Sequence, residues 1–522
     1  MIKRSWIRRV RRAILATGTT AVLAAGLLTA TATTSQAAAQ GPYDIYAAGG
    51  TPCVTAHSTT RALYGAYNGP LYQVRRASDG TTKDIGLLST GGYANAPAQD
   101  SFCAATSCVI TVIYDQSGKG NSLTQALKGS WPGPAAGGND NLANAFEAPV
   151  TVAGHEAYGV YIAPGTGYRN NHTNGIATRD QPEGMYAIFD GTHFNGGCCF
   201  DYGNAETSGT DTGNGHMEAI YFGNNTGWGR GSGNGPWVMA DLENGLFSGV
   251  NRGLNAGDPS INDRFVTAIV KGEPNHWAIR TGNAQSGGLS TGYSGPRPSD
   301  SGYNPMHKEG SIILGIGGDN SNGSAGTFYE GVMTSGYPSD ATENAVQANI
   351  TAAGYNSAAT SSGSLRPGSR ISLQATTAPC CTSHYLRHDD ADARVVISAI
   401  DSSSSATDKA DASWIVRAGL ADTSCLSFES ADSPGQFLRH YAFELYLNTD
   451  DGGSDFAQDA TFCPTSGNSG GGKSFQSVNY PTKYIRHYGY TGYVASNGGS
   501  NAWDSATSWA ADTSWLVDQP WG

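Results

Sequence analysis

Two short segments carry carboxylates in settings that suit chemistry. Residues 237–244 (WVMADLEN) indicate a strand whose alternation places Asp241 and Glu243 on one face. Two carboxylates on one face repel each other, which raises the pKa of one of them; a solvated edge strand would show the same pattern. In residues 315–320 (GIGGDN), Asp319 follows an apolar strand and two glycines. That setting suits either the floor of a pocket or an Asx turn.

Adjacent cysteines at Cys198 and Cys199 are a third chemical feature. If they are bridged to each other, they form a small rigid ring whose apolar surface suits packing against one face of a sugar. Two free thiols, or two thiols bridged elsewhere, are the alternative.

The last third of the chain contains a threefold repeat. Each unit begins with Tyr or Phe, an aliphatic residue, Arg and His in consecutive positions. Further along, each has an Asp followed by a small residue, a hydroxyl residue and an aromatic residue. A His beside a carboxylate offers a donor and an acceptor to sugar hydroxyls; pairs that only bridge strands are the alternative, and the aromatic residues are expected in the core. The three pairs are His388 with Asp411, His440 with Asp459, and His487 with Asp512.

The elements that position these residues are expected to be strands. The 522 residues include 71 Gly, 10% aromatic and only 14% charged residues, which excludes a coiled coil and favours an all-β protein with many turns. Residues 109–114 indicate a strand. One helix is expected between a Ser339 cap and Gly354, with Glu343 as the capping-box acid.

Small polar residues at 358–370 predict a linker between a first domain at 40–357 and a second at 371–522. The repeats of the second domain are each too small to bury a face alone. Three units of four short strands would assemble as a β-trefoil.

The balance of charge argues against nucleic acid as a partner. The chain has 31 basic and 43 acidic residues, a net charge of −12, and six of the basic residues lie in the first 40. The remainder has 25 basic against 43 acidic residues, or −18, so it is a poor binder of phosphates. A neutral ligand such as a sugar is compatible with this charge.

The N-terminus has the order of a secretory signal. A basic stretch at 3–12 precedes an apolar stretch at 13–30 and small residues at 35–40, so residues 1–39 are interpreted as a signal peptide, with a membrane anchor as the alternative. The expected location is therefore secreted and extracellular. No other apolar run is long enough to span a membrane.

Nine cysteines in an exported chain predict disulfides, with at least one cysteine left over. The spacing of Cys103 and Cys108 suits a staple across a short hairpin, and Cys425 and Cys463 are placed to close one loop. No CxxC pair or His cluster indicates zinc.

Long strings within the chain are similar to one enzyme family. They are DIY at 44–46, HSTTRAL at 57–63, IYDQSG at 113–118, CCFDYGNAE at 198–206 and GIGGDNSNG at 315–323. Over nearly the whole mature length, the chain resembles secreted α-L-arabinofuranosidases of glycoside hydrolase family 54 that carry a C-terminal arabinose-binding module of family 42.

The resemblance implies a β-sandwich catalytic domain followed by a β-trefoil. It places the nucleophile at Glu243 and the acid/base at Asp319. Sugar contacts in the pocket would fall on Asp241, Asn244, Gly245, Gly318 and Trp228, with a bridged Cys198–Cys199 in the wall. In the module, the second and third repeats would bind arabinose through His440, Phe443 and Asp459, and through His487 and Asp512; the first repeat is usually weaker or silent.

Some positions depart from the family's pattern. Tyr43 stands where the family has the cysteine that pairs with Cys53, and the Cys380–Cys381 pair is extra. Gly245 and, in the module, Ala442 also depart, which weakens the contacts inferred at those positions.

The implied activity is that of a retaining glycosidase that releases terminal arabinofuranosyl residues from arabinan and arabinoxylan. Two carboxyls about 5–5.5 Å apart suffice for that chemistry, so neither a metal nor an organic cofactor is expected. The expected partner is plant cell-wall polysaccharide, and we expect a monomer. A hydrolase of another furanoside or of xylosides, or a polysaccharide-binding protein without catalysis, remains the alternative.

Overall fold

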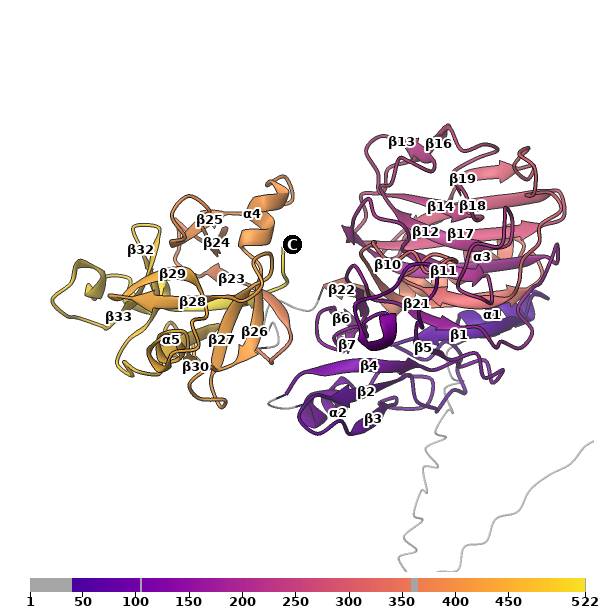
Figure 1. Ribbon diagram of the computed structural model, residues 1–522. Helices are drawn as coiled ribbons and strands as arrows, with labels where there is room; N and C mark the ends of the chain where they lie inside the picture. The colour runs from indigo at the N-terminus through magenta and orange to yellow at the C-terminus, as the bar shows by residue number, and fades with distance from the viewer. Residues whose placement is uncertain (1–39, 104–105, 358–364, 522) are drawn as a thin grey trace, which may run out of the picture. The chain divides into compact units, whose positions relative to one another are not determined.

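The computed structural model describes residues 40–103, 106–357 and 365–521 (Figure 1). The predicted signal at 1–39 and residues 358–364 of the predicted linker lie outside the described residues. The described residues form mainly β-strands, which confirms the all-β prediction, and the strands belong to two separate parts. Within these ranges, no helix combines the length and the apolar character needed to cross a membrane.

The first part is built on a ten-stranded sheet whose neighbouring strands are antiparallel. The predicted strand at 109–114 is present here as β4. In spatial order the strands are β15 (Leu246–Phe247), β14 (Trp237–Asp241), β12 (Glu218–Gly223), β11 (Asp201–Ala205), β20 (Ser311–Leu314), β9 (Tyr168–Asn170), β5 (Leu123–Gln125), β4 (Cys108–Ile113), β2 (Tyr72–Arg76) and β3 (Thr82–Ile85).

A second antiparallel sheet faces the first. Its strands are β1 (Cys53–Ser58), β21 (Gly326–Ser335), β10 (Glu183–Phe194), β17 (Phe265–Glu273), β18 (His276–Asn283) and β19 (Ser290–Gly295), with β8 (Val160–Ile162) paired to β21. Smaller elements are β6 (Pro149–Val152), β7 (His155–Tyr158) and β22 (Tyr355–Ser357), the parallel pair β13 (Arg230–Ser232) and β16 (Leu254–Pro259), and the short helix η1 (Ala136–Gly138).

Aromatic side chains from both sheets fill the space between them. The ring of Phe189 on β10 lies 5.6 Å from that of Phe222 on β12, and the ring of Tyr202 on β11 lies 5.0 Å from that of Phe328 on β21. All four are buried. Two sheets with interdigitating inner faces form the predicted β-sandwich.

A buried ion cluster also ties the two sheets together. Lys308 Nζ lies 3.0 Å from Glu183 Oε1 on β10 and 2.9 Å from Glu218 Oε2 on β12, and Arg297 Nη1 lies 2.5 Å from the other oxygen of Glu218. Since buried charges are tolerated only when they are paired, this cluster holds β12 against β10. β12 in turn pairs with β14, the strand that leads into the site described below.

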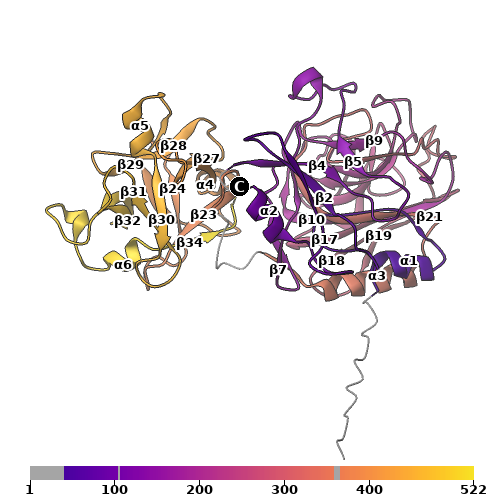
Figure 2. The ribbon, with the colours of Figure 1, turned by 90° about the horizontal axis from the view of Figure 1, so that it is seen from below.

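The predicted helix is present as α3 (Asp340–Ala353), beside α1 (Pro42–Ala48) (Figures 1 and 2). Ser339 caps it by accepting from the Thr342 amide, and Gly354 ends it with a φ of 66°. Glu343, which the sequence suggested as a capping acid, instead accepts from Lys271 Nζ at 2.9 Å and from Arg280 Nη1 at 2.7 Å.

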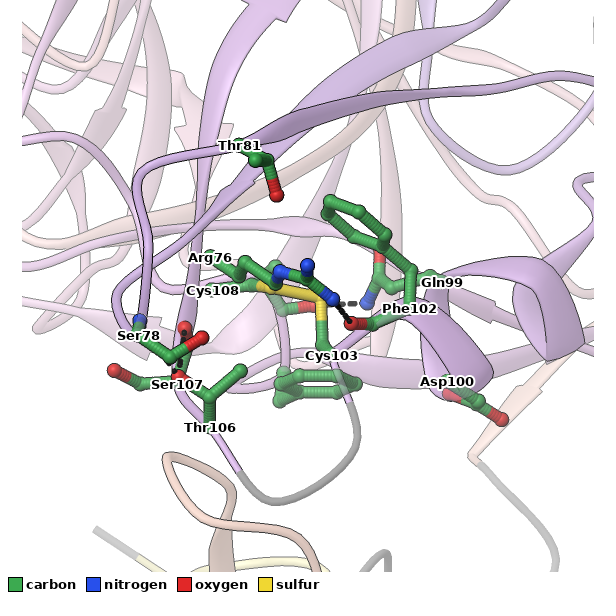
Figure 3. Close-up of a disulfide and its surroundings, with 12 residues drawn as sticks. Arg76, Ser78, Thr81, Gln99, Asp100, Phe102, Cys103, Thr106, Ser107 and Cys108 are labelled. Atoms are coloured by element: carbon green, nitrogen blue, oxygen red, sulfur yellow. Dashed lines mark hydrogen bonds between the residues drawn. A yellow bond between two sulfur atoms is a disulfide. The ribbon is translucent and has the colours of Figure 1, made fainter.

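The predicted disulfide Cys103–Cys108 is present (Figure 3), but the expected hairpin is wrong, because the bond links the end of a helix, α2 (Ala96–Phe102), to the start of β4. Arg76 from β2 lies over the ring of Phe102, 4.8 Å from its centroid, and donates to the Phe102 carbonyl at 3.4 Å. The staple therefore holds a short helix against the far edge of the sandwich.

The second part has threefold strand pairing. Its strands are β23 (Arg370–Ala375), β24 (His384–His388), β25 (Val395–Ala399), β26 (Trp414–Ala418), β27 (Leu426–Ser430), β28 (Gln436–Tyr441), β29 (Glu444–Thr449), β30 (Phe462–Ser466), β31 (Lys473–Ser477), β32 (Tyr484–Tyr488), β33 (Thr491–Ala495) and β34 (Trp515–Asp518). In each unit the second and third strands form a hairpin, the first pairs with the fourth, and the fourth pairs with the next unit. This is the pairing of the predicted β-trefoil.

Each unit of the trefoil presents its His and Asp at element ends. The histidines lie at or next to the ends of β24, β28 and β32, and each aspartate is the last residue of a short helix, α4 (Ala406–Asp411), α5 (Ser454–Asp459) or α6 (Trp509–Asp512); η2 (Ala502–Asp504) precedes α6. The aromatic residues of the repeat lie in the core, as predicted: Trp414 Nε1 donates to the Leu386 carbonyl at 2.9 Å, and Trp515 Nε1 to that of Ile485 at 3.2 Å. The predicted Cys425–Cys463 disulfide is also present.

Candidate active site

A cavity of about 520 Å³ opens at the β14–β15 edge of the ten-stranded sheet. It brings together all nine residues that the sequence placed in the catalytic pocket, from three segments that are distant in the chain. They are Cys198, Cys199, Trp228, Asp241, Glu243, Asn244, Gly245, Gly318 and Asp319. The sequence reasoning missed other lining residues, which include Trp131, Asp211, Leu246 and Ser321.

Glu243 lies in the tight turn that joins β14 to β15. The expectation that residues 237–244 form one strand is wrong at its end, because β14 stops at Asp241 and both Glu243 and Asn244 have positive φ values of 62° and 56°. The Glu243 amide donates to Asp241 Oδ1 at 3.0 Å, and the Tyr303 hydroxyl donates to the Glu243 carbonyl at 2.7 Å. The two carboxylates therefore meet through a turn and not through strand alternation.

Asp319 lies in the loop after β20, and this loop is both an Asx turn and part of the cavity wall, the two alternatives that the sequence left open. Its Oδ1 accepts from the Ser321 amide at 2.9 Å, which is an Asx turn, and its Oδ2 accepts from Trp131 Nε1 at 2.9 Å at the cavity wall. Two donors thus fix the orientation of a half-buried carboxyl that lines the cavity.

Gly318 shows how closely the two segments approach. A β-carbon at this position would overlap Glu206 Oε2 and would lie 2.9 Å from Glu243 Oε2. The backbone next to Asp319 is therefore in contact with the Glu243 carboxyl, and only glycine leaves room for it.

Further carboxyls lie near Glu243; those of Asp201 and Glu206 are buried, whereas Asp211 is exposed. One oxygen each of Glu206, Asp211 and Glu243 lie within 4.8 Å of one another. Both oxygens of Asp201 and of Glu206 are buried, with no hydrogen-bond donor among the described residues. Carboxyl groups in such a setting retain protons, because burial and neighbouring negative charge both disfavour ionisation.

The pKa values follow this environment. Burial first, and then Glu206 and Asp241, raise the pKa of Glu243 to about 11. Burial raises the pKa of Asp241 to about 7, and burial together with Asp241 raises the pKa of Asp201 well above its usual range. These groups titrate as a set, so the protons belong to the cluster rather than to single residues.

Arg169 on β9 supplies positive charge behind the cluster. Its Nη1 donates to the Gly318 carbonyl at 2.8 Å and its Nη2 donates to the Glu206 carbonyl. The guanidinium is buried, so it both positions the two backbone segments and offsets part of the negative charge.

Cys198 and Cys199 are bridged to each other and form one wall of the cavity. The backbone holds the wall in place, since the Cys199 amide donates to the Ser321 carbonyl at 3.3 Å and the Gly323 amide donates to that of Cys198 at 3.1 Å. Trp228, which is 47% exposed, lies at the mouth. Apolar walls with carboxyls between them suit a ring that has apolar faces and polar edges, such as a sugar.

The trefoil residues pair as the repeats predicted, and each pair has a third partner that sequence reasoning missed. In the second repeat, His440 Nε2 lies 3.0 Å from Asn479 Oδ1 and 3.4 Å from Asp459 Oδ1, and its ring lies 6.2 Å from that of Phe443. Asn479 belongs to the next repeat, so the site forms only when the trefoil closes.

In the third repeat, the Thr377 hydroxyl lies 2.9 Å from His487 Nε2 and donates to Asp512 Oδ1 at 2.9 Å. The first repeat differs, because the third partner of His388 is a second carboxylate, Asp432, 3.1 Å from its Nε2.

Two family models match the chain: the catalytic model of alpha-L-arabinofuranosidase B over residues 42–356, and the alpha-L-arabinofuranosidase B (ABFB) domain over residues 374–517. The probable alpha-L-arabinofuranosidase B of Aspergillus terreus is 68% identical over 84% of this chain and 86% of its own length. An arabinofuranosidase/B-xylosidase of Trichoderma koningii is 61% identical over 93% and 96%. A crystal structure of an arabinofuranosidase complexed with arabinofuranosyl-alpha-1,2-xylobiose is 59% identical, covers 92% of this chain and 100% of its own, and has a TM-score of 0.63.

We predict that Glu206→Gln makes stability less dependent on pH. A carboxyl whose pKa is raised in the folded state contributes stability that is present below its unfolded pKa of about 4.3 and is lost as the pH rises toward the folded value. An amide at 206 removes one charge that raises the pKa of Glu243. The fall in melting temperature between about pH 5 and about pH 9 should therefore shrink by roughly 2 °C or more.

The matched control is Asp300→Asn, an acid-to-amide change at an exposed residue whose ion-pair partner is Arg252 and not a histidine, which should leave the pH dependence as it is in the parent chain. A Glu206→Gln chain whose melting temperature falls over this range as steeply as that of the parent would contradict the carboxyl cluster.

Proposed function

The chain belongs to the alpha-L-arabinofuranosidase B family, and from this membership we propose that it is a retaining hydrolase of terminal α-L-arabinofuranosyl residues. The proposal rests above all on one observation: the Glu243 turn and the Asp319 loop meet in one cavity, with Gly318 in contact with the Glu243 carboxyl. Two carboxyls across one sugar ring are what glycoside hydrolysis requires.

In the first step, Glu243 attacks the anomeric carbon of the arabinofuranosyl group while Asp319 protonates the glycosidic oxygen that leaves. The product is an ester between Glu243 and the sugar. Glu243 must be ionised to attack, so the proton shared within the cluster has to lie elsewhere. We propose that Glu206, whose carboxyl lies next to that of Glu243, holds it at that moment.

In the second step, Asp319 removes a proton from water, which attacks the anomeric carbon and releases Glu243. Asp319 can serve in both steps because Trp131 Nε1 and the Ser321 amide fix its orientation. Asp241, which is anchored by the Glu243 amide, is placed to accept from sugar hydroxyls. The Cys198–Cys199 wall would pack against one face of the ring.

The substrate we propose is an arabinofuranosyl side chain of arabinan or arabinoxylan. The solved relative carries an arabinofuranosyl group on xylobiose, and the second part of the chain matches the ABFB domain. We propose that this trefoil binds arabinofuranosyl side chains through its second and third repeats and holds the enzyme on the polysaccharide. The signal-like residues 1–39 support the proposal that the chain is exported.

A second candidate activity is the hydrolysis of β-xylosides. The name of the Trichoderma koningii relative includes it, and a xylosyl group has the same number of carbons as an arabinosyl group. Assays on aryl α-L-arabinofuranoside and aryl β-xyloside in parallel measure the ratio of the two activities.

We predict that Glu243→Ala and Asp319→Ala each lower turnover of 4-nitrophenyl α-L-arabinofuranoside by about a thousandfold or more, because each removes one member of a pair that acts together. Added azide should rescue each variant to a product of different configuration. With Glu243→Ala, azide replaces the nucleophile and gives the β-azide; with Asp319→Ala, azide attacks the Glu243 ester and gives the α-azide. Rescue of both variants to the same anomer would contradict the assigned roles.

Gly318→Ala should lower turnover by roughly a hundredfold, the scale expected when catalytic groups are displaced by about 1 Å. The new methyl group would push against the carboxyls of Glu206 and Glu243. Gly288→Ala is the matched control, since a β-carbon there meets nothing within 4 Å. Normal turnover in Gly318→Ala would mean that the two segments do not meet as described.

Binding and catalysis should separate. We predict that the double variant His440→Ala with His487→Ala no longer sediments with insoluble arabinoxylan, because both proposed sugar sites lose a hydrogen-bonding side chain. Turnover of the small aryl substrate should be unchanged. Retained sedimentation would place the polysaccharide-binding surface elsewhere.

A further inference from the structure

The Cys380–Cys381 pair lies outside the mechanism and outside the family pattern described above. The two cysteines are bridged to each other, and the disulfide lines a cavity of about 450 Å³ in the third repeat of the trefoil. The same cavity holds His487, Asp512 and their partner Thr377. A disulfide between adjacent residues therefore lines a cavity in both parts of this chain, at Cys198–Cys199 and at Cys380–Cys381.

The second repeat shows what surrounds the equivalent polar trio. There, two aromatic rings stand beside His440, Asp459 and Asn479. The ring of Phe443 lies 6.2 Å from that of His440, and the ring of Tyr480 lies 4.9 Å from that of Phe443 and 5.4 Å from that of His440. The two rings contact each other and together form one apolar surface beside the hydrogen-bonding trio, which suits a small ring with polar edges.

The first of these rings has an equivalent in the third repeat. Phe443 occupies the last position of the β28–β29 turn with a φ of 72°, and Tyr490 occupies the last position of the β32–β33 turn with a φ of 69°. Tyr490 lines the cavity. One aromatic wall is therefore common to both repeats.

The second ring has no equivalent in the third repeat. Asn479 is followed by Tyr480 and a proline, whereas Thr377 is followed by Ala378 and a proline. Cys380 and Cys381 come directly after that proline, and the Cys381 amide donates to the Thr377 carbonyl at 2.9 Å. Ala378 therefore holds the sequence position of Tyr480, and the turn that begins at Thr377 brings the disulfide, two residues further on, to the cavity wall.

Cys380 and Cys381 differ in exposure, and each exposure fits a disulfide that forms the wall of a binding site. Cys381 is 3% exposed and belongs to the trefoil core, whereas Cys380 is exposed. The buried residue anchors the ring, and the exposed residue presents polarizable, apolar surface to a ligand.

The first repeat serves as an internal contrast. Ala393 holds the position of Phe443 and Tyr490, with a φ of 58°, and Ser433 holds the position of Tyr480. Its polar trio also contains a second carboxylate, Asp432. The first repeat therefore has the polar trio without an aromatic ring or a disulfide at these positions. The apolar wall is a separate feature of the second and third repeats.

We propose that the Cys380–Cys381 disulfide is an apolar wall of the third-repeat sugar site, against which one face of a bound arabinofuranose packs in place of an aromatic ring. The ligand class is a neutral pentofuranose. This inference rests on the proposed function, because it assumes that the trefoil binds arabinofuranosyl groups.

The experiment removes the disulfide while each sugar site is isolated in turn. The full-length chain, inactivated by Glu243→Ala so that it does not consume the polysaccharide, carries either His440→Ala, which leaves the third-repeat site, or His487→Ala, which leaves the second. Cys380→Ser with Cys381→Ser is added to each, and the affinity for insoluble arabinoxylan is measured by sedimentation. In the His440→Ala chain the serine pair should weaken binding about fivefold, the scale of one aromatic-type contact; in the His487→Ala chain it should change nothing.

One further variant and one comparison separate a wall from a merely structural role. Ala378→Tyr, added to the serine pair in the His440→Ala chain, restores the ring of the second repeat and should recover most of the lost affinity. Because Cys381 belongs to the trefoil core, folding of the trefoil is checked within the trefoil itself: unchanged binding through the second repeat in the His487→Ala chain shows that the serine pair has not unfolded it.

The outcomes distinguish this inference from the function on which it rests. If the Glu243→Ala chain itself does not bind arabinoxylan, the proposed binding role of the trefoil is overturned. If that chain binds but the His440→Ala chain does not, the third repeat is no sugar site and the wall is overturned alone. If the serine pair leaves binding by the His440→Ala chain unchanged, or weakens both chains equally, the disulfide is not a wall of this site.

Discussion

Acidic groups confined in one buried cluster are the constraint on which the rest of this enzyme depends. Asp201, Glu206, Asp241 and Glu243 are buried within a few side chains of one another, and no arrangement of four ionised carboxylates would be stable there. Some of these carboxyls must therefore stay protonated, and the pKa of each one depends on which of its neighbours carries a proton. The same protons allow one carboxyl to attack while its neighbour stays neutral, so the feature that costs stability also makes the chemistry possible.

The backbone, more than any single side chain, keeps these groups together. A turn with two left-handed residues presents Glu243, and a glycine lets the Asp319 loop approach it. Arg169 joins the backbone on both sides of the cluster. The bridged Cys198–Cys199 forms an uncharged wall of the cavity, so it does not increase the negative charge there. The two proposed sugar sites of the trefoil carry less uncompensated charge, because each aspartate there has an arginine as counter-ion: Arg439 Nη1 lies 3.9 Å from Asp459 Oδ2, and Arg486 Nη2 lies 2.7 Å from Asp512 Oδ2.

Much of this arrangement could be predicted from the sequence, and the failures have physical reasons. Asp241, Glu243 and Asp319 lie in one cavity as predicted, since the strings that contain them are long and specific. The turn at Glu243 was missed because alternation of side chains continues in sequence beyond the point where the strand ends. Asp201 and Glu206 belong to the string at 198–206 that resembles the family, but their spacing does not indicate that both carboxyls lie near Glu243. Asp201 is the first residue of β11 and Glu206 directly follows this strand. Trp131, Asn479 and Thr377 act through contacts with distant segments, and only the folded chain brings those segments together.

The configuration of the product tests the central claim most directly, because it reports whether two carboxyls act on opposite sides of one pentose ring through a covalent intermediate. Cleavage of 4-nitrophenyl α-L-arabinofuranoside in the presence of methanol would trap the sugar as a methyl glycoside that does not mutarotate, and NMR would assign its anomer. The account predicts methyl α-L-arabinofuranoside. A methyl β-L-arabinofuranoside would contradict it, because that product requires direct displacement without the Glu243 ester.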